Sequence, residues 1–132
     1  MADYTIPDEL RYSEEDEWVR RDADRAVVGV TDYAQDQLGD IVFVEFPEVG
    51  TRIEKGAPFG EIESVKAVSA LYAPAGGVVV AVNGALEDAP EKVNEDCYGD
   101  GWLIEIGEVD SSQLDSLLDA AAYRRHVDQR SE

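Results

Sequence analysis

The sequence predicts a mainly β fold, a small sandwich or barrel, in one domain over residues 1–132. Short runs that are rich in valine or led by an aromatic residue recur along the chain, with turn signals between them at regular spacing. The segment 39–45 also resembles 77–83, and each copy precedes a turn-rich stretch and an aromatic-led run. A domain of this length buries enough surface to fold without disulfides or metals.

Two apolar runs near the start predict a pair of strands. Residues 18–20 begin the first strand, 22–24 form an Asp-containing turn, and 26–30 return the chain. This order, strand, turn and strand, is typical of a β-hairpin.

A short helix and a buried strand are predicted next. Thr31 is suited to cap a helix near 31–38, and Gly39 is placed to end it. Residues 41–44 are apolar throughout, which predicts a strand buried on both faces.

The second half of the chain predicts three more strands. Residues 59–63 and 67–72 have the pattern of the two arms of a hairpin, and 78–82 form the next strand after a Pro/Gly-rich break. The segment 83–101 is predicted to be a loop, and 102–106 to be the last strand.

The chain is predicted to close with an α-helix near 112–125. Ser112 followed by Asp115 makes a capping signal at its start. Four apolar side chains then fall on one helical face: Leu114, Leu117, Leu118 and Ala121.

The chain is strongly acidic, with 30 Asp and Glu against 11 Lys and Arg, and a formal charge of −19. Such a surface repels phosphate backbones and anionic lipids, which argues against nucleic-acid and membrane partners. Two explanations remain open: an acidic face that docks on basic partners, and a carboxylate surface of the kind that halophiles use. We favour the second because acids occur in every segment and the only lysines are Lys55, Lys66 and Lys92. We therefore expect a halophilic archaeal source.

Cys97 and His126 are the only cysteine and histidine. They exclude an intramolecular disulfide and argue against metal and thiol catalysis, since zinc sites need three or four ligands. No apolar run approaches the roughly 18–20 residues of a membrane span, and the first residues lack the regions of a signal peptide. We therefore expect a cytoplasmic protein.

Lys66 lies between the two predicted hairpin arms, in Glu63-Ser64-Val65-Lys66-Ala67-Val68. One interpretation is an ordinary solvated turn lysine. The other is an amine displayed to a modifying enzyme, because lysine is scarce here and its neighbours are small or stiff. No Asn-Gly or Asp-Gly pair favours a tight turn, although a type I turn would tolerate these residues. Spacing alone leaves both interpretations open.

Several ordered motifs resemble the glycine cleavage H proteins over roughly residues 7 to 125. The matching segments are 10–13, 17–19, 31–35, 38–44, 59–60, 63–69, 71–74, 93–94, 98–99, 101–104 and 117–118, with Tyr123. The resemblance implies a barrel-sandwich hybrid fold of the lipoyl- and biotinyl-carrier type. Biotin carriers place their lysine between two methionines, a pattern that Val65 and Ala67 do not fit.

The resemblance further implies lipoic acid in amide linkage to Lys66, within the attachment segment formed by Glu63, Ser64, Val65 and Ala67. It implies a non-catalytic carrier, expected to be a monomer, whose tethered arm meets successive enzymes at high effective concentration. The implied partners are a pyridoxal-phosphate glycine decarboxylase, a tetrahydrofolate-dependent aminomethyltransferase, a flavin dihydrolipoyl dehydrogenase, and a lipoate ligase or lipoyl transferase.

The family folds its loaded arm into a polar surface cleft. By resemblance, Glu17 interacts there with the bound amine. Asp16 stands where the family usually has histidine, and Ala70 where aspartate is common, so Asp16 is a candidate to replace the lost charge. The alternative is that residues 15–17 form only a solvated acidic turn. Cys97 replaces a usual proline, which we interpret as a loop substitution.

Two other functions share the same motifs. One is a lipoate relay, which donates lipoyl groups to oxoacid dehydrogenase subunits without taking part in glycine metabolism. The other is an unmodified interaction module that keeps only the fold.

Overall fold

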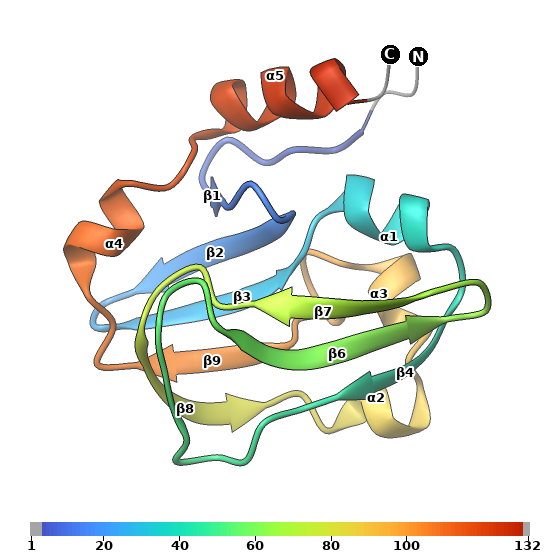
Figure 1. Cartoon of the computed structure of the whole chain (residues 1–132), viewed down its shortest axis with the longest axis horizontal. Coiled ribbons are helices and arrows are strands. Elements are labelled where there is room, and N and C mark those ends of the chain that lie inside the picture. Colours follow the sequence, from blue (N-terminus) through green and yellow to red (C-terminus); the bar gives the residue numbers. More distant parts are fainter. Residues whose placement is uncertain (1–3, 131–132) are drawn as a thin grey trace.

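The computed structural model describes residues 4–130, which form two antiparallel β-sheets and five short helices (Figure 1). The larger sheet has the strand order β1-β2-β3-β9-β8-β5, and the smaller has the order β4-β6-β7. This architecture confirms the predicted mainly β fold. The strands are β1 Arg11–Tyr12, β2 Glu17–Asp22, β3 Arg25–Val30, β4 Ile41–Glu45, β5 Arg52–Ile53, β6 Pro58–Ser64, β7 Val68–Tyr72, β8 Gly77–Val82 and β9 Ile104–Gly107. The helices are α1 Asp32–Leu38, α2 Ala85–Asp88, α3 Lys92–Glu95, α4 Ser111–Asp115 and α5 Ala120–Arg130.

Strands β2 and β3 form the predicted N-terminal hairpin, in which Trp18 is paired with Gly29. A Cβ atom on Gly29 would lie 2.5 Å from the Trp18 indole, far inside contact distance. Gly29 therefore leaves the space that the buried Trp18 ring occupies.

Helix α1 forms as the sequence predicts. The Thr31 hydroxyl accepts a hydrogen bond from the Ala34 N–H at 3.2 Å, which satisfies one free donor of the first turn. Gly39 ends the helix with φ 81, a conformation that costs glycine little.

The prediction of a strand buried on both faces at 41–44 is wrong. Strand β4 is an edge strand of the three-stranded sheet, and its register with β6 shifts between Ile41 and Phe43. Val42 is 49% exposed and Phe43 is 51% exposed, while Ile41 and Val44 are buried. An apolar run in an edge strand with one uncovered face cannot bury all its side chains.

The predicted hairpin of β6 and β7 and the following strand β8 are confirmed. The last strand begins at Ile104, later than predicted, and Trp102 packs against a separate core cluster. The segment predicted as a loop, 83–101, contains α2 and α3, each a single turn. Helices this short leave little periodicity in a sequence.

The predicted C-terminal helix is confirmed, but it is not one continuous helix over 112–125. The chain forms α4 and α5 with a break between them, and Asp110 rather than Ser112 caps α4. In the break, Leu118 pairs with Tyr12 of β1 through two backbone hydrogen bonds of 2.9 Å. These bonds hold the chain extended where helical periodicity alone predicts a continuous helix.

Two apolar clusters form the core. The larger cluster includes buried side chains from both sheets, such as Val28, Ile62 and Ile106. The smaller lies under α5, where the Tyr12 and Tyr123 rings stack with centroids 4.7 Å apart. This second cluster fastens α5 and the N-terminal segment to the six-stranded sheet.

Candidate functional site

Lys66 lies in the bend between β6 and β7, and Ser64 closes that bend. The Ser64 Oγ accepts hydrogen bonds from the Lys66 N–H at 3.3 Å and from the Ala67 N–H at 3.1 Å. The Ser64 N–H donates to the Ala67 carbonyl at 2.8 Å. A serine hydroxyl thus takes the place of the Asn-Gly or Asp-Gly pair that the sequence lacks.

The bend is also anchored to the start of β4. The Val65 N–H donates to the Asp40 carbonyl at 3.0 Å. A Cβ on Gly39 would lie 3.5 Å from Lys66 Cε, so the lysine stem passes over the end of α1. The backbone of the bend is therefore fixed on both sides of Lys66.

The Lys66 amine is exposed and, among residues 4–130, takes part in no ion pair or side-chain hydrogen bond. Val65, Ala67 and Glu63 are exposed beside it, while Ser64 is buried. An amine on a fixed bend, without a competing partner, is accessible to a modifying enzyme.

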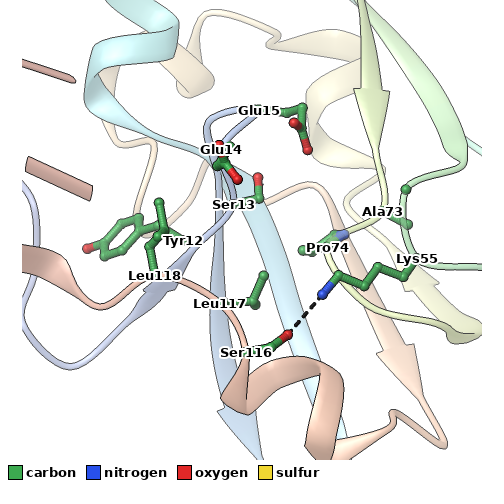
Figure 2. A pocket seen from close by; sticks show the side chains of 11 residues that line it. Tyr12, Ser13, Glu14, Glu15, Lys55, Ala73, Pro74, Ser116, Leu117 and Leu118 are labelled. Carbon is green, nitrogen blue, oxygen red and sulfur yellow. Dashed lines mark hydrogen bonds between the residues drawn. The ribbon is translucent and has the colours of Figure 1, made fainter. Parts of the chain in front are cut away.

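Lys55 differs from Lys66. It lines a separate cavity of about 150 Å³, where its Nζ donates to the Ser116 Oγ at 2.9 Å (Figure 2). Its amine is therefore already engaged, as an ordinary structural lysine would be.

A cleft of about 170 Å³ lies between the loop before β2, helix α1 and the β6–β7 hairpin. Leu38 lines it and directly precedes Gly39, over which the Lys66 stem passes. Its lining includes the side chains of Glu15, Asp16, Glu17, Leu38, Ser69 and Ala70. The structure thus brings Asp16, Glu17 and Ala70 together in one cleft.

Glu17 is buried, with 2% exposure, so the solvated-turn interpretation fails for this residue. The Ser13 hydroxyl donates to its Oε1 at 2.5 Å, and the Tyr72 N–H donates to its Oε2 at 3.2 Å. Burial raises the pKa of Glu17 to about 8, against the lowering effect of these two hydrogen bonds. Glu17 thereby joins β2 of the larger sheet to β7 of the smaller one.

Asp16 adopts φ 75, and its carboxylate is held by the C-terminal helix. Arg130 donates to both carboxylate oxygens, at 3.1 Å and 2.5 Å, and the Tyr123 hydroxyl donates at 2.8 Å. The Arg130 guanidinium also lies 4.7 Å above the Tyr33 ring of α1. Arg130 therefore balances the Asp16 charge, and Ala70 adds none.

The sequence could not reveal the role of Arg130. It is 114 residues away from Asp16, and no motif marks their contact. Glu15 is exposed and fits the solvated-turn interpretation, in contrast to Glu17.

Cys97 is buried, and burial raises the pKa of its thiol to about 12. Its carbonyl accepts a hydrogen bond from the Trp18 indole N–H at 2.9 Å. A protonated, buried thiol is a poor nucleophile, which agrees with interpreting Cys97 as a structural loop residue.

Residues 4–130 contain no group of three His, Cys, Asp or Glu side chains arranged to hold a metal ion. None of their helices has the length and apolar character to cross a membrane.

Comparisons with known proteins agree with this geometry. A family model described as "Glycine cleavage H-protein" matches residues 10–130. A glycine cleavage system H protein of Anaeromyxobacter sp. (strain K) is 53% identical over 125 residues, covering 95% of this chain and 98% of the relative. A probable glycine cleavage system H protein of Natronomonas pharaonis is 57% identical over 124 residues, covering 94% and 98%.

A comparison with solved structures points to the same family. The crystal structure of a glycine cleavage system H protein from Mycobacterium marinum superposes with a TM-score of 0.82 at 36% identity, covering 96% of this chain and 100% of that one. The chain therefore belongs to the family of glycine cleavage H proteins, the non-catalytic, lipoate-bearing carriers of the glycine cleavage system.

Proposed function

We propose that this chain carries its lipoyl group in amide linkage to Lys66 and shuttles aminomethyl groups between the enzymes of the glycine cleavage system. The observation that carries this proposal is the exposed, unpartnered Lys66 amine within residues 4–130, set on a bend that Ser64 and Asp40 hold. A lipoate ligase or lipoyl transferase would reach this amine without breaking an internal contact. Glu63, Ser64, Val65 and Ala67 would form the segment that the modifying enzyme reads.

When bound, the lipoyl group supplies the disulfide that takes up an aminomethyl group and two electrons. Lys66 tethers it, and a tether turns each meeting with an enzyme into a local event. The partners we propose are the pyridoxal-phosphate glycine decarboxylase, the tetrahydrofolate-dependent aminomethyltransferase and the flavin dihydrolipoyl dehydrogenase. The protein itself would hold and orient the arm and would catalyse none of these steps.

We propose that the cleft beside α1 shelters the loaded arm from water. The Lys66 stem already points along the end of α1, and Leu38 continues that path into the cleft. Glu17 would meet the arm's amine, and a bound cation there would favour its ionised form. Asp16 would act by position rather than charge, because Arg130 balances its carboxylate.

We further propose one lipoyl-carrier domain over 1–132, acting as a cytoplasmic monomer. Adjacent β2 residues join the two core clusters, since Val19 belongs to the larger and Trp18 to the smaller. A net charge of −19 opposes self-association.

Glycine–bicarbonate exchange with the cognate decarboxylase tests this function. The lipoylated chain should stimulate exchange, and a Lys66→Arg chain, which keeps the charge, should not. Lipoylation on Lys66 without stimulation would instead favour the lipoate relay. Hydrolysis of the loaded arm tests the cleft: an unchanged rate in Glu17→Gln would remove Glu17 from it. Asp16→Asn should leave the rate unchanged if Asp16 contributes only its position.

A further inference from the structure

The C-terminal helix α5 packs on the smaller core cluster, and its last turn reaches towards the cleft beside α1. Ala120, Tyr123 and Val127 are buried in that cluster, so one face of α5 is fixed along its length. In Figure 1 the end of α5 that carries Arg130 lies on the side of α1. The last turn of α5 can therefore contact both α1 and the loop before β2.

Two side chains of α5 join that loop to α1. The Tyr123 hydroxyl donates to the Asp16 carboxylate at 2.8 Å and accepts from the Thr31 hydroxyl, at the cap of α1, at 2.7 Å. The Arg130 guanidinium binds both oxygens of the same carboxylate and lies over the Tyr33 ring of α1. Asp16 lines the cleft from one side and residues of α1 line it from another. Helix α5 therefore ties two walls of the cleft together, although the cleft lining includes none of its described residues.

The loop before β2 is a small rigid unit, so the position of Asp16 sets that of Glu17. The Ser13 N–H donates to the Glu17 carbonyl at 2.9 Å, and the Asp16 N–H donates to the Ser13 carbonyl at 3.2 Å. The Ser13 hydroxyl accepts from the Glu17 N–H and donates to the Glu17 carboxylate. Asp16 also has φ 75, a left-handed conformation that a non-glycine residue keeps only when its surroundings favour it. Loss of the contacts on the Asp16 carboxylate would therefore loosen the segment that carries Glu17.

We propose that α5 sets the shape of the arm cleft, with Arg130 as the positioning residue. Arg130 acts through Asp16 and Tyr33, because its contacts with them hold the Glu17 segment and α1 at a fixed separation. This inference rests on the proposed function, since it requires the loaded arm to lie in the cleft.

The geometry favours positioning over a purely structural role. The apolar face of α5 is sufficient to hold the helix on the smaller cluster. Arg130 adds a bidentate contact outside that cluster, with side-chain exposures of 34% for Arg130 and 18% for Asp16. A guanidinium can grip a carboxylate and stack on an aromatic ring at the same time, which suits a residue that links two walls.

The test measures hydrolysis of the loaded arm, as release of ammonia. The full-length carrier is loaded from glycine by the cognate decarboxylase and then separated from it. Arg130→Ala should raise the hydrolysis rate about fivefold, the lower end of the range for coupling between two sites. Arg130→Lys still places a cation beside Asp16 and should restore most of the protection. Asp16→Asn keeps an oxygen that accepts from Arg130 and Tyr123, so its rate should stay close to that of the wild type.

Two control variants separate positioning from a general loss of stability. Arg125→Ala removes an exposed cation of the same helix that takes part in no ion pair or hydrogen bond among residues 4–130, and it should leave the rate unchanged. Val79→Ala leaves a cavity at a buried position of β8 that does not line the cleft. It should lower the urea unfolding midpoint without raising the rate of hydrolysis. All rates are compared under conditions in which unfolding curves show every variant to be folded.

The proposal and the proposed function fail on different results. A wild-type rate in Arg130→Ala, or an equal rise in Val79→Ala, would overturn the positioning role while leaving the cleft as a shelter. A wild-type arm that is hydrolysed no more slowly than free aminomethyl dihydrolipoamide would show that the cleft gives no shelter, and the proposed function of the cleft would fail.

Discussion

The pH dependence of stability should report the burial of Glu17. Its pKa rises from 4.5 to about 8 in the folded state, mainly through burial. The unfolded chain releases this proton at lower pH than the folded chain, so the stabilisation is complete below the unfolded pKa and is lost as pH rises towards 8. Each pH unit between the two pKa values lowers the free energy of unfolding by about 1.4 kcal/mol, so the loss between pH 5 and pH 9 is about 4 kcal/mol.

Glu17→Gln removes this dependence while keeping the contacts. The amide oxygen can accept from the Tyr72 N–H, and the amide nitrogen can donate to the Ser13 Oγ. Urea unfolding at fixed KCl from pH 5 to pH 9 should therefore give a flatter curve for Glu17→Gln. The variant should be similar to the wild type at pH 5 and more stable by several kcal/mol at pH 9. Parallel curves for the two proteins would refute this reasoning.

Three further predictions concern stability. Asp16→Asn and Arg130→Gln should each destabilise the chain. A double-mutant cycle should give a coupling of about 1 kcal/mol, because the pair is partly buried and bidentate. Additive effects would show that the contact contributes nothing to stability. Gly29→Ala should cost about 1–3 kcal/mol in urea unfolding, because its Cβ meets the Trp18 ring. Gly84→Ala, with no atom within 4 Å, is its control, and equal losses would contradict the steric argument. Unfolding midpoints should rise with added KCl, since salt screens the repulsion of a −19 chain; a flat response would argue against a salt-adapted, halophilic source.

Local signals in the sequence predicted the elements whose causes are local. The Thr31 cap and Gly39 termination of α1 depend on neighbouring residues, and both are confirmed. The hairpin arms around Lys66 also follow from local alternation. The closure of that bend by Ser64 was not predicted, because one serine in a turn is a weak signal without coordinates.

The errors come from contacts between distant segments. Residues 41–44 are apolar enough for a buried strand, but their place at a sheet edge is set by tertiary topology. Leu118 continues a helical pattern, but its pairing with Tyr12 breaks the helix. The contact of Arg130 with Asp16 likewise joins two ends of the chain, and no single-sequence pattern reports it.

The cleft was predicted in part. The resemblance to glycine cleavage H proteins predicts that Glu17 is an acid near the arm. Its burial and its hydrogen bond with Tyr72 follow only from the packing of the two sheets. The sequence makes Asp16 a candidate to replace the charge that Ala70 lacks, but Arg130 balances the Asp16 carboxylate, and a single sequence does not report that contact.

Mass spectrometry of the protein purified from its native source tests the central claim most directly. The chain has only three lysines, Lys55, Lys66 and Lys92, so peptide mapping can assign a modification without ambiguity. The account predicts molecules heavier by one lipoyl group, with the increment on the Lys66 peptide and absent from a Lys66→Arg chain. An unmodified chain throughout, or an increment on Lys55 or Lys92, would contradict it.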